Sequence, residues 1–344
     1  MSTTEYKLDN VLDKTIKNKK IFGCISNIES LDGGFSWSDS RGSMDVNTPY
    51  AIASITKMYT TAIIIKLIDD GLLSFEDVIE KYFSKGYLTD LHKYKGVDYT
   101  STITIRQLLS HTSGLPDSST EKNSAGKTYF DEVFQNDIEI TLDDSINRTK
   151  TLNPHFINGT KGKAFYSDIN FDLLGEIAKV ITEKELKEIY NEFIIQLLGL
   201  ENTFLCEKDS VFAPIYLNGQ PLNRPLTVSS AGASGGIIST AQETMKFLKA
   251  FFNGNLFDQS NLLLLYQWNR IQWYPLEYGL GLMRCKMSRI MSPLFPAPEI
   301  IGHSGSTGTF AFYCPTKELF ITGTINQIKK QPFQLIYSLL NCFD

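Results

Sequence analysis

Ala51-Ile52-Ala53-Ser54-Ile55-Thr56-Lys57-Met58 leads into an apolar run that ends near Gly71. The run leaves only a narrow polar stripe and therefore predicts a buried helix, with apolar residues at Ala62, Ile63, Ile64, Ile65, Leu67 and Ile68. Because Ser54 and Lys57 are three positions apart, a helix places hydroxyl and amine on one face, about one turn apart. A partly desolvated lysine can take the proton that a serine loses when it becomes a nucleophile. The stretch indicates either a rigidly held nucleophile or an ordinary core helix with a serine in its first turn.

The same spacing occurs a second time and does not identify a nucleophile by itself. Ser124-Ala125-Gly126-Lys127 also separates serine from lysine by two residues. It lies in residues 117–128, which are rich in Ser, Thr, Asn, Lys and Gly and which we interpret as a mobile surface loop. Both interpretations of Ser54 stay open at this point.

Composition and charge narrow the class of protein. A chain of 344 residues with 42% hydrophobic content predicts a large core, in one elaborate domain or two closely packed lobes. The net charge of −5 includes no block of like charge, which argues against nucleic acid or an anionic membrane as a partner. Lys66 interrupts the longest apolar segment, so we expect no membrane span. The first residues lack the basic and apolar segments of a secretory signal, and we expect a cytoplasmic protein.

Cysteine and histidine spacing argues against metal sites and disulfides. The cysteines are odd in number, widely spaced and without a CxxC pair: Cys24, Cys206, Cys285, Cys314 and Cys342. This pattern favours reduced thiols. The histidines lie far apart and form no HExxH motif: His92, His111, His155 and His303. This spacing predicts no metal site. We also expect no organic cofactor.

Strand patterns occur at both ends of the chain and helical patterns in its middle. After a helix over residues 4–19, two strand-like runs joined by Asp32-Gly33-Gly34 predict a hairpin. Further strands are predicted over 278–285, 300–303, 309–314 and 319–325, and a closing helix over 332–341. In the middle, capping boxes at Ser74 and Thr104 each open a predicted helix, and a long helical pattern covers 170–198. Residues 226–231 read as a weak strand, and 239–252 as a helix.

This distribution predicts an α+β fold with a discontinuous domain. Residues 1–72 and 232–344 would form a lobe with an antiparallel sheet flanked by helices, and residues 73–231 an all-helical insertion. The helix after Ser54 would then lie at the seam between the lobes, where clefts tend to form.

Two further motifs carry polar groups suited to catalysis. Tyr166-Ser167-Asp168 precedes a helical pattern, although a tyrosine there is commonly a packing residue and Asp168 is equally well explained as an N-cap. His303-Ser304-Gly305 ends a predicted strand, where glycine lets a ligand approach the backbone. Taken alone, the second motif also reads as a glycine-rich turn with a structural histidine.

In this order, Ser-x-x-Lys, Tyr-x-Asn and Lys/His-x-Gly mark the penicillin-recognising serine enzymes. The sequence resembles that family at Ser54–Lys57, Tyr166–Asp168 and His303–Gly305, over about residues 45–325. Members include class C β-lactamases, D-alanyl-D-alanine carboxypeptidases, D-aminopeptidases and related serine esterases. The resemblance implies the β-lactamase/transpeptidase-like fold. It also implies a serine hydrolase that cleaves a small-molecule ester, a peptide-like amide or, weakly, a β-lactam through a covalent acyl-enzyme.

The resemblance also implies a role for each motif residue. Ser54 would attack the carbonyl, while Lys57 and Tyr166 share the proton transfers. Since both groups have pKa values near 10 in water, the site must lower one of them by about two to three units. The backbone N–H groups of Ser54 and Ser306 would form the oxyanion hole. Residues expected along the substrate are Asp168, His303, Ser304, Gly305 and Ser306.

The sequence departs from the family pattern at two positions. Asp168 stands where the family usually has asparagine, and an ionised aspartate cannot donate a hydrogen bond to a substrate carbonyl. Asp168 also favours a charged Lys57, which opposes a role as base. His303 stands where β-lactamases have lysine, and a neutral imidazole attracts a β-lactam carboxylate less. Both departures favour ester or D-peptide hydrolysis over β-lactam hydrolysis.

Two rival interpretations remain. Gly232-Ala233-Ser234-Gly235-Gly236 matches the nucleophile elbow of α/β-hydrolases, with Asp258 and His303 as the only partners in the required order. That motif needs a strand directly before the serine and a helix directly after it, and here the strand pattern is weak and the helix starts late. The second rival is a non-hydrolytic binding or scaffold module that has kept the fold.

Overall fold

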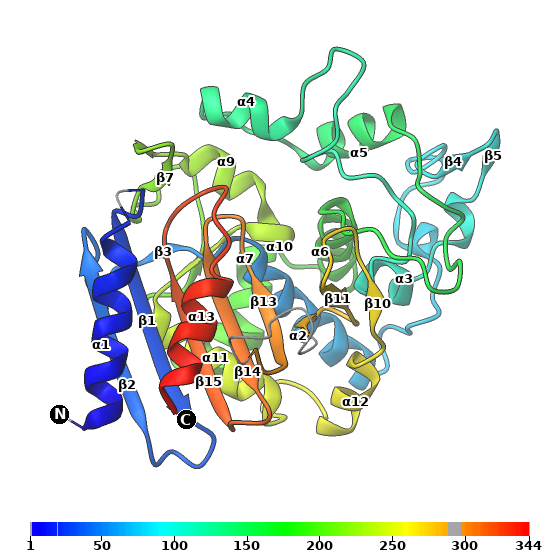
Figure 1. The fold of residues 1–344 in the computed structure, drawn as a ribbon. Helices are drawn as coiled ribbons and strands as arrows, with labels where there is room; N and C mark the ends of the chain where they lie inside the picture. The colour runs from blue at the N-terminus through cyan, green and yellow to red at the C-terminus, as the bar shows by residue number, and fades with distance from the viewer. Residues whose placement is uncertain (1, 19, 288–296, 344) are drawn as a thin grey trace.

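An antiparallel sheet to which both ends of the chain contribute strands forms the centre of the molecule (Figure 1). The computed structural model describes residues 2–18, 20–287 and 297–343. Within these ranges the sheet has eight strands in the order β10–β11–β12–β13–β14–β15–β1–β2. Their bounds are β1 Gly23–Ser30, β2 Ser36–Gly42, β10 Asn269–Arg270, β11 Leu276–Tyr278, β12 Met283–Cys285, β13 Ile300–Ser304, β14 Thr309–Cys314 and β15 Leu319–Thr324. The predicted hairpin at Asp32-Gly33-Gly34 is confirmed, because β1 and β2 pair with Ile28 opposite Trp37.

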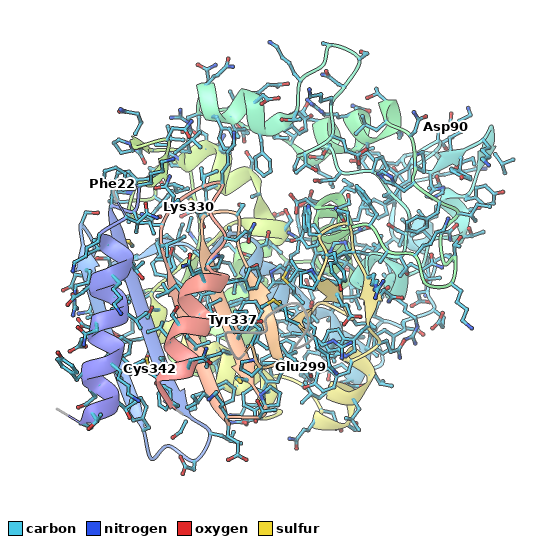
Figure 2. All side chains as sticks on the ribbon, viewed as in Figure 1. Phe22, Asp90, Glu299, Lys330, Tyr337 and Cys342 are labelled. Atoms are coloured by element: carbon cyan, nitrogen blue, oxygen red, sulfur yellow. The ribbon has the colours of Figure 1, made fainter. Side chains whose placement is uncertain are left out.

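Helices cover both faces of this sheet. α1 (Thr3–Ile16) and α13 (Phe333–Leu340) lie in front of it in Figure 1, while α11 (Ala241–Phe252) packs against β1, β14 and β15. Tyr337 of α13, labelled in Figure 2, is buried. Every residue of β15 is buried, as expected for a strand covered on two sides.

Helices dominate the chain between β2 and the C-terminal strands. They are α2 Thr56–Asp69, α3 Ile105–Leu109, α4 Tyr129–Gln135, α5 Leu142–Thr151, α6 Ile169–Thr182, α7 Leu186–Tyr190, α8 Gln196–Leu198, α9 Pro225–Ser230, α10 Gly232–Gly235 and α12 Leu262–Leu265. The same segment carries the short strands β3 Tyr50–Ala51, β4 Lys93–Tyr94, β5 Val97–Asp98, β6 Phe204–Leu205, β7 Ile215–Leu217, β8 Gln220–Leu222 and β9 Ile237–Ser239. Asp90 marks the end of this part that lies farthest from α1 (Figure 2). The predicted α+β class is confirmed, whereas the lobe boundaries at 72/73 and 231/232 stay predictions.

α2 is the buried helix that the sequence predicts. It follows a single turn of 3₁₀ helix, Ala53–Ile55, and contacts α6 and α10. Its buried residues include the polar Lys57, whose side chain is 0% exposed. Since charged side chains are almost never fully buried without partners, Lys57 requires them inside the protein.

Three predicted elements differ in the structure. Ser74 opens a turn and not an α-helix: its N–H bonds Asp77 Oδ2 at 2.9 Å, but Val78 then bridges Thr104 in extended form. A 3₁₀ turn, Ile79–Tyr82, follows in place of the helix. Residues 226–231 form helix α9 and not a strand, because Pro225 occupies the first turn, where its missing N–H does no harm.

Residues 278–285 form two strands where the pattern predicts one. Gly279 N–H bonds Leu282 O at 2.8 Å and reverses the chain between β11 and β12. Gly281 in that turn has φ +72°, and a Cβ there would lie 1.8 Å from Thr61 Oγ1. The turn therefore packs directly on α2 and requires glycine at this position.

Candidate active site

Ser54 lies where a short strand turns into the buried helix. β3 pairs with β9, and Ile52 N–H bonds Ile237 O at 3.0 Å, which fixes the chain just before the serine. Ala53 has φ +49°, a left-handed conformation that costs a residue with a Cβ about 1–3 kcal/mol. This turn leaves Ser54 half-buried at the wall of a cavity.

Lys57 uses all three of its ammonium N–H groups. Its Nζ lies 3.2 Å from Ser54 Oγ, 2.7 Å from Asp168 Oδ1 and 2.7 Å from the backbone oxygen of Ser234. A protonated amine in this position donates to the Ser54 oxygen and cannot at the same time accept the Ser54 proton. In its protonated form Lys57 would therefore hold the serine oxygen and leave the serine O–H free for another partner.

The other group at Ser54 is the hydroxyl of Tyr166. Tyr166 lies in the loop before α6, its ring is buried, and Lys57 Nζ lies 5.0 Å from the ring centroid. Burial raises the pKa of Tyr166 well above its usual value, and the charge of Asp168 adds to the rise. A hydrogen bond with Ser54 acts on the pKa in the opposite direction. Ser54, Lys57 and Tyr166 are thus brought together from segments that are far apart in the sequence.

Three aspartates lie close to Lys57 or Tyr166, and the sequence identified one of them. Asp168 stands at the N-cap position of α6 but makes no side-chain capping bond, and pairs with Lys57 instead. Asp117 accepts the backbone N–H of Asp168 at 3.2 Å, and Asp172 lies one turn along α6. Burial, followed by the charge of Asp168, raises the pKa of Asp117 and of Asp172 to about 7. No local motif marks Asp117 or Asp172, although the helical i, i+4 spacing from Asp168 points to the latter.

His303 is buried and neutral. Its Nδ1 lies 2.8 Å from Ser304 O and its Nε2 lies 3.1 Å from Tyr278 Oη. The carbonyl can only accept, so Nδ1 carries the proton and Nε2 accepts from the tyrosine. Burial lowers the pKa of His303 to about 3, and the charge of Lys57 contributes. The imidazole presents no positive charge to a substrate.

The turn after β13 brings Ser306 to the cavity. Thr307 Oγ1 donates to Ala51 O at 3.0 Å and Thr309 Oγ1 to Ile52 O at 2.9 Å, which ties the turn to the segment that carries Ser54. A Cβ at Gly305 would lie 2.2 Å from Thr309 Oγ1, so this approach requires glycine. Ser304 differs from its neighbours, since it is buried with its hydroxyl against the sulfur of Met283 at 3.5 Å.

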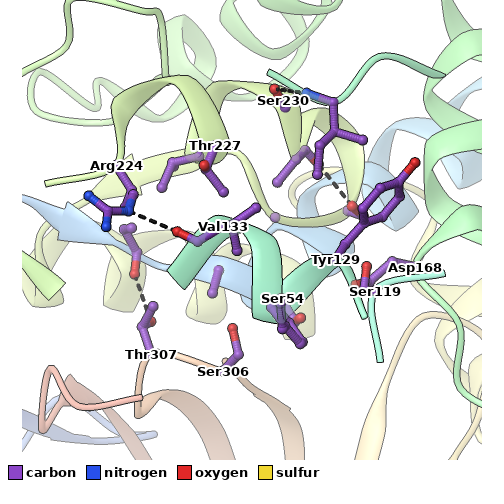
Figure 3. Close-up of a pocket in the computed structure, with 18 of the residues that line it drawn as sticks. Ser54, Ser119, Tyr129, Val133, Asp168, Arg224, Thr227, Ser230, Ser306 and Thr307 are labelled. Carbon is purple, nitrogen blue, oxygen red and sulfur yellow. Dashed lines mark hydrogen bonds between the residues drawn. The ribbon is translucent and has the colours of Figure 1, made fainter. Parts of the chain in front are cut away.

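One cavity runs from Ser54 to helix α4 (Figure 3). Its polar end contains Ser54, Asp168, Asp172 and Ser306. Its apolar walls come mainly from α4 and the segments facing it, with Tyr129, Phe130, Val133, Phe134, Ile140, Ile215, Leu222, Val228 and Ile328. Arg224 also lines the cavity, but its guanidinium bonds Val133 O at 2.8 Å and Phe134 O at 3.1 Å and so holds α4 in place.

Ser234 and Ser124 lack the surroundings of a nucleophile. Ser234 lies in α10, not between strand and helix, and its hydroxyl donates to Ala231 O at 2.8 Å. Its expected partner Asp258 is exposed and caps a 3₁₀ turn at Ser260. Ser124 is exposed in the loop before α4. The elbow interpretation fails because its required context is absent among the described residues.

Comparison with known proteins places the chain in a family. A family model described as Beta-lactamase matches residues 26–336, so the chain belongs to the beta-lactamase family. This confirms the family predicted from the three motifs and, with it, the predicted class of serine hydrolase.

The individual relatives are named for different substrates. Escherichia coli K12 AmpH, a D-alanyl-D-alanine-carboxypeptidase/endopeptidase, is 26% identical over 76% of this chain, which spans 66% of its length. A D-stereospecific amidohydrolase from Streptomyces sp. superposes with a TM-score of 0.78 at 23% identity, covering 96% of this chain and 97% of that one. D-amino acid amidase from Ochrobactrum anthropi SV3 gives 0.80 at 18% identity, covering 99% and 98%.

The sequence predicts no membrane span and no metal site, and the structure bears on both only for the residues that it describes. Among them, no helix has the length and apolar character needed to cross a membrane. The same residues contain no group of three or more His, Cys, Asp or Glu side chains placed to hold a metal ion.

Proposed function

We propose that this protein hydrolyses amides or esters whose acyl part carries an ammonium group near the scissile carbonyl. Ser54 attacks the carbonyl, and the substrate's apolar side chain enters the cavity toward α4. Compounds of this class include amino acid amides, and the relatives named as D-amino acid amidase and D-stereospecific amidohydrolase support it.

The charge around the nucleophile carries this proposal. Asp168 and Asp172 line the cavity beside Ser54, whereas Lys57 is fully buried and committed to three acceptors. Of the other basic groups near the cavity, His303 is neutral, and Arg224 binds the carbonyls of α4. Arg148 lies over the ring of Tyr129 and bonds Glu132 and the backbone oxygen of Lys127. Lys329 lies over the ring of Phe134, at the α4 end of the cavity and not at Ser54. An ammonium group is therefore favoured here and a free carboxylate is disfavoured, which argues against carboxypeptidase and β-lactamase activity.

In the first chemical step, the Ser54 oxygen forms a bond to the carbonyl carbon and its proton passes to the oxygen of Tyr166. Tyr166 must be ionised to accept that proton, and the nearby carboxylates disfavour its ionisation. A bound substrate ammonium offsets those carboxylates and so lowers the pKa of Tyr166 when the substrate is in place. The backbone N–H groups of Ser54 and Ser306 then stabilise the tetrahedral oxyanion.

In the second step, Tyr166 returns the proton to the leaving nitrogen or oxygen as the carbon–heteroatom bond breaks. The acyl group remains as an ester on Ser54 until a water molecule, deprotonated by the same tyrosine, attacks the ester carbon. The bond from that carbon to the Ser54 oxygen then breaks, Tyr166 returns the proton to Ser54, and the acyl group leaves as a carboxylic acid. Lys57 stays an ammonium throughout and holds the Ser54 oxygen in line.

A set of matched substrates tests the proposal. Phenylalanine amide has an ammonium and no carboxylate, N-acetyl-phenylalanine amide has neither, and phenylalanyl-alanine has both. We expect kcat/KM for the free amine amide to exceed that for the acetylated amide by about 10-fold or more, in one enantiomer. Asp172→Asn should reduce this ratio, and Ser54→Ala should abolish turnover.

Two outcomes would contradict the proposal. Faster turnover of the dipeptide than of the amide would point to a carboxypeptidase. Absence of both turnover and an acyl adduct, measured by intact mass with activated esters and a fluorescent penicillin, would favour a binding module.

A further inference from the structure

The side-chain amide of Gln272 bonds both the backbone N–H and the backbone oxygen of Tyr166. Tyr166 N–H donates to Gln272 Oε1 at 2.8 Å, and Gln272 Nε2 donates to Tyr166 O at 3.0 Å. One side-chain amide thus occupies the place that a neighbouring strand's backbone would take. The two residues are 106 positions apart in the sequence, and Gln272 belongs to none of the family motifs.

Tyr166 depends on such contacts because its own segment has no regular structure. Residues 163–167 form neither helix nor strand. The neighbours of Tyr166 are held on the other side by His111, whose backbone oxygen accepts Phe165 N–H at 2.9 Å and whose Nδ1 accepts Ser167 N–H at 3.2 Å. The tyrosine backbone is therefore held between His111 and Gln272.

The segment that carries Gln272 also contacts the tyrosine ring. Trp273, the next residue, lies with its ring centroid 5.1 Å from that of Tyr166, tilted by 48°. Tyr278, at the end of β11, meets the same ring edge-on at 5.6 Å. Figure 1 shows the β10–β11 hairpin at the end of the sheet away from α1. Backbone and ring of Tyr166 are thus set by one hairpin at the edge of the sheet.

We propose that Gln272 is a positioning residue that holds the Tyr166 hydroxyl at Ser54 during proton transfer. The proposal rests on the role of Tyr166 given above. Gln272 does not contact the reacting atoms and acts only through the tyrosine. Because Gln272 is itself exposed, its replacement removes the two hydrogen bonds without opening a cavity in the core.

Steady-state kinetics with phenylalanine amide test this role, with enzyme concentrations taken from titration of acylated Ser54. Gln272→Ala should lower kcat by roughly 10- to 100-fold, the effect of a small misplacement of a catalytic group, with KM changed less than threefold. Gln267→Ala, at another exposed glutamine near the same hairpin, is the matched control and should keep kcat within twofold of the wild type.

Gln272→Glu distinguishes positioning of Tyr166 from a purely structural role, because only positioning makes kcat of this variant depend on the protonation of residue 272. The carboxylate still accepts from Tyr166 N–H but repels Tyr166 O, whereas the protonated acid can donate to that oxygen. The ratio of Gln272→Glu to wild-type kcat should therefore rise as pH falls from 8 toward 5, while the ratio for Gln272→Ala stays constant.

The outcomes separate this inference from the proposed function. If Tyr166→Phe is inactive but Gln272→Ala keeps wild-type kcat, Gln272 does not position the tyrosine and only this inference fails. If Tyr166→Phe retains full activity, the proposed role of Tyr166 fails first. A Gln272→Ala protein that loses active sites on titration but keeps kcat per site would show a structural role only.

Discussion

Lys57 and Asp168 form an ion pair of 2.7 Å in which the lysine side chain is fully buried and the aspartate side chain is 24% exposed. The aspartate occupies the position where the family usually has asparagine, so this pair replaces a neutral contact with a charged one. The pair gives the buried amine of Lys57 a partner, and the charge of Asp168 contributes to the raised pKa of Tyr166.

Replacing this aspartate should make the tyrosine easier to ionise. In Asp168→Asn the amide still accepts from Lys57, but the negative charge near Tyr166 is gone, so the pKa of Tyr166 falls. We expect the rate of acylation by penicillin or by an amide without an ammonium group to rise, and the alkaline rise of the pH–rate profile to move to lower pH. Intact mass after timed incubation measures acylation. An unchanged rate would mean that Asp168 has no electrostatic effect on the reacting groups.

The raised pKa of Asp117 predicts a pH-dependent stability. Its carboxyl titrates near 7 in the folded protein and near 3.9 in an unfolded chain. Between these values the folded state binds the extra proton, so the contribution of Asp117 to the free energy of unfolding falls as pH rises from about 4 to 7. The difference in free energy of unfolding between Asp117→Asn and the wild type should therefore be about 1–3 kcal/mol more favourable to the variant at pH 8 than at pH 5. Urea denaturation at both pH values measures the difference, and equal differences would contradict the assignment.

Asp172 predicts a pH dependence of substrate binding. Its carboxyl, also titrating near 7, must be ionised to attract a substrate ammonium. KM for phenylalanine amide, calculated on the concentration of its protonated form, should therefore fall as pH rises from 6 to 8, by roughly 3- to 10-fold. The correction for the substrate is needed because an α-amino group itself titrates near 7.7–8.0. The acetylated amide is the control and should show no such change, and Asp172→Asn should flatten the dependence for the free amine.

The assignment of the nucleophile is tested with a p-nitrophenyl ester, which needs no ammonium recognition. Ser54→Ala should lower kcat by 10³-fold or more. Ser234→Ala should keep most of the activity, because only the backbone oxygen of Ser234 contacts Lys57. Exposed Ser124→Ala is the neutral comparison. Loss of activity in a folded Ser234→Ala enzyme together with an active Ser54→Ala enzyme would reverse the assignment.

Gly305 should be sensitive to the smallest substitution. The Cβ of Gly305→Ala would lie 2.2 Å from Thr309 Oγ1 and 2.8 Å from Ile52 O, so the turn that carries Ser306 must move away from Ser54. Displacing one oxyanion donor typically lowers kcat by about 10²–10³. Gly34→Ala, in the exposed turn between β1 and β2, is the matched control and should leave kcat unchanged. Retention of activity by Gly305→Ala would exclude the Ser306 N–H as a donor.

Local patterns predicted much of the fold because the interactions behind them are local. The apolar run after Ser54 predicted the buried helix α2, and Asp32-Gly33-Gly34 predicted the turn between β1 and β2. The capping box at Thr104 is formed as expected, with Gln107. Ser74 failed as a helix start because the bridge between Val78 and Thr104, a tertiary contact, outweighs a local preference worth about 1 kcal/mol.

The sequence by itself determined the candidates for nucleophilic and proton-transfer chemistry, since Ser54, Lys57 and Tyr166 lie in motifs of fixed order and spacing. Only the tertiary structure decided the electrostatics around them. Asp117, Asp172 and Gln272 belong to no motif, yet they surround the lysine and the tyrosine. The physical reason is that pKa values and hydrogen-bond partners depend on burial and on distances across the folded chain, which spacing along the sequence does not encode.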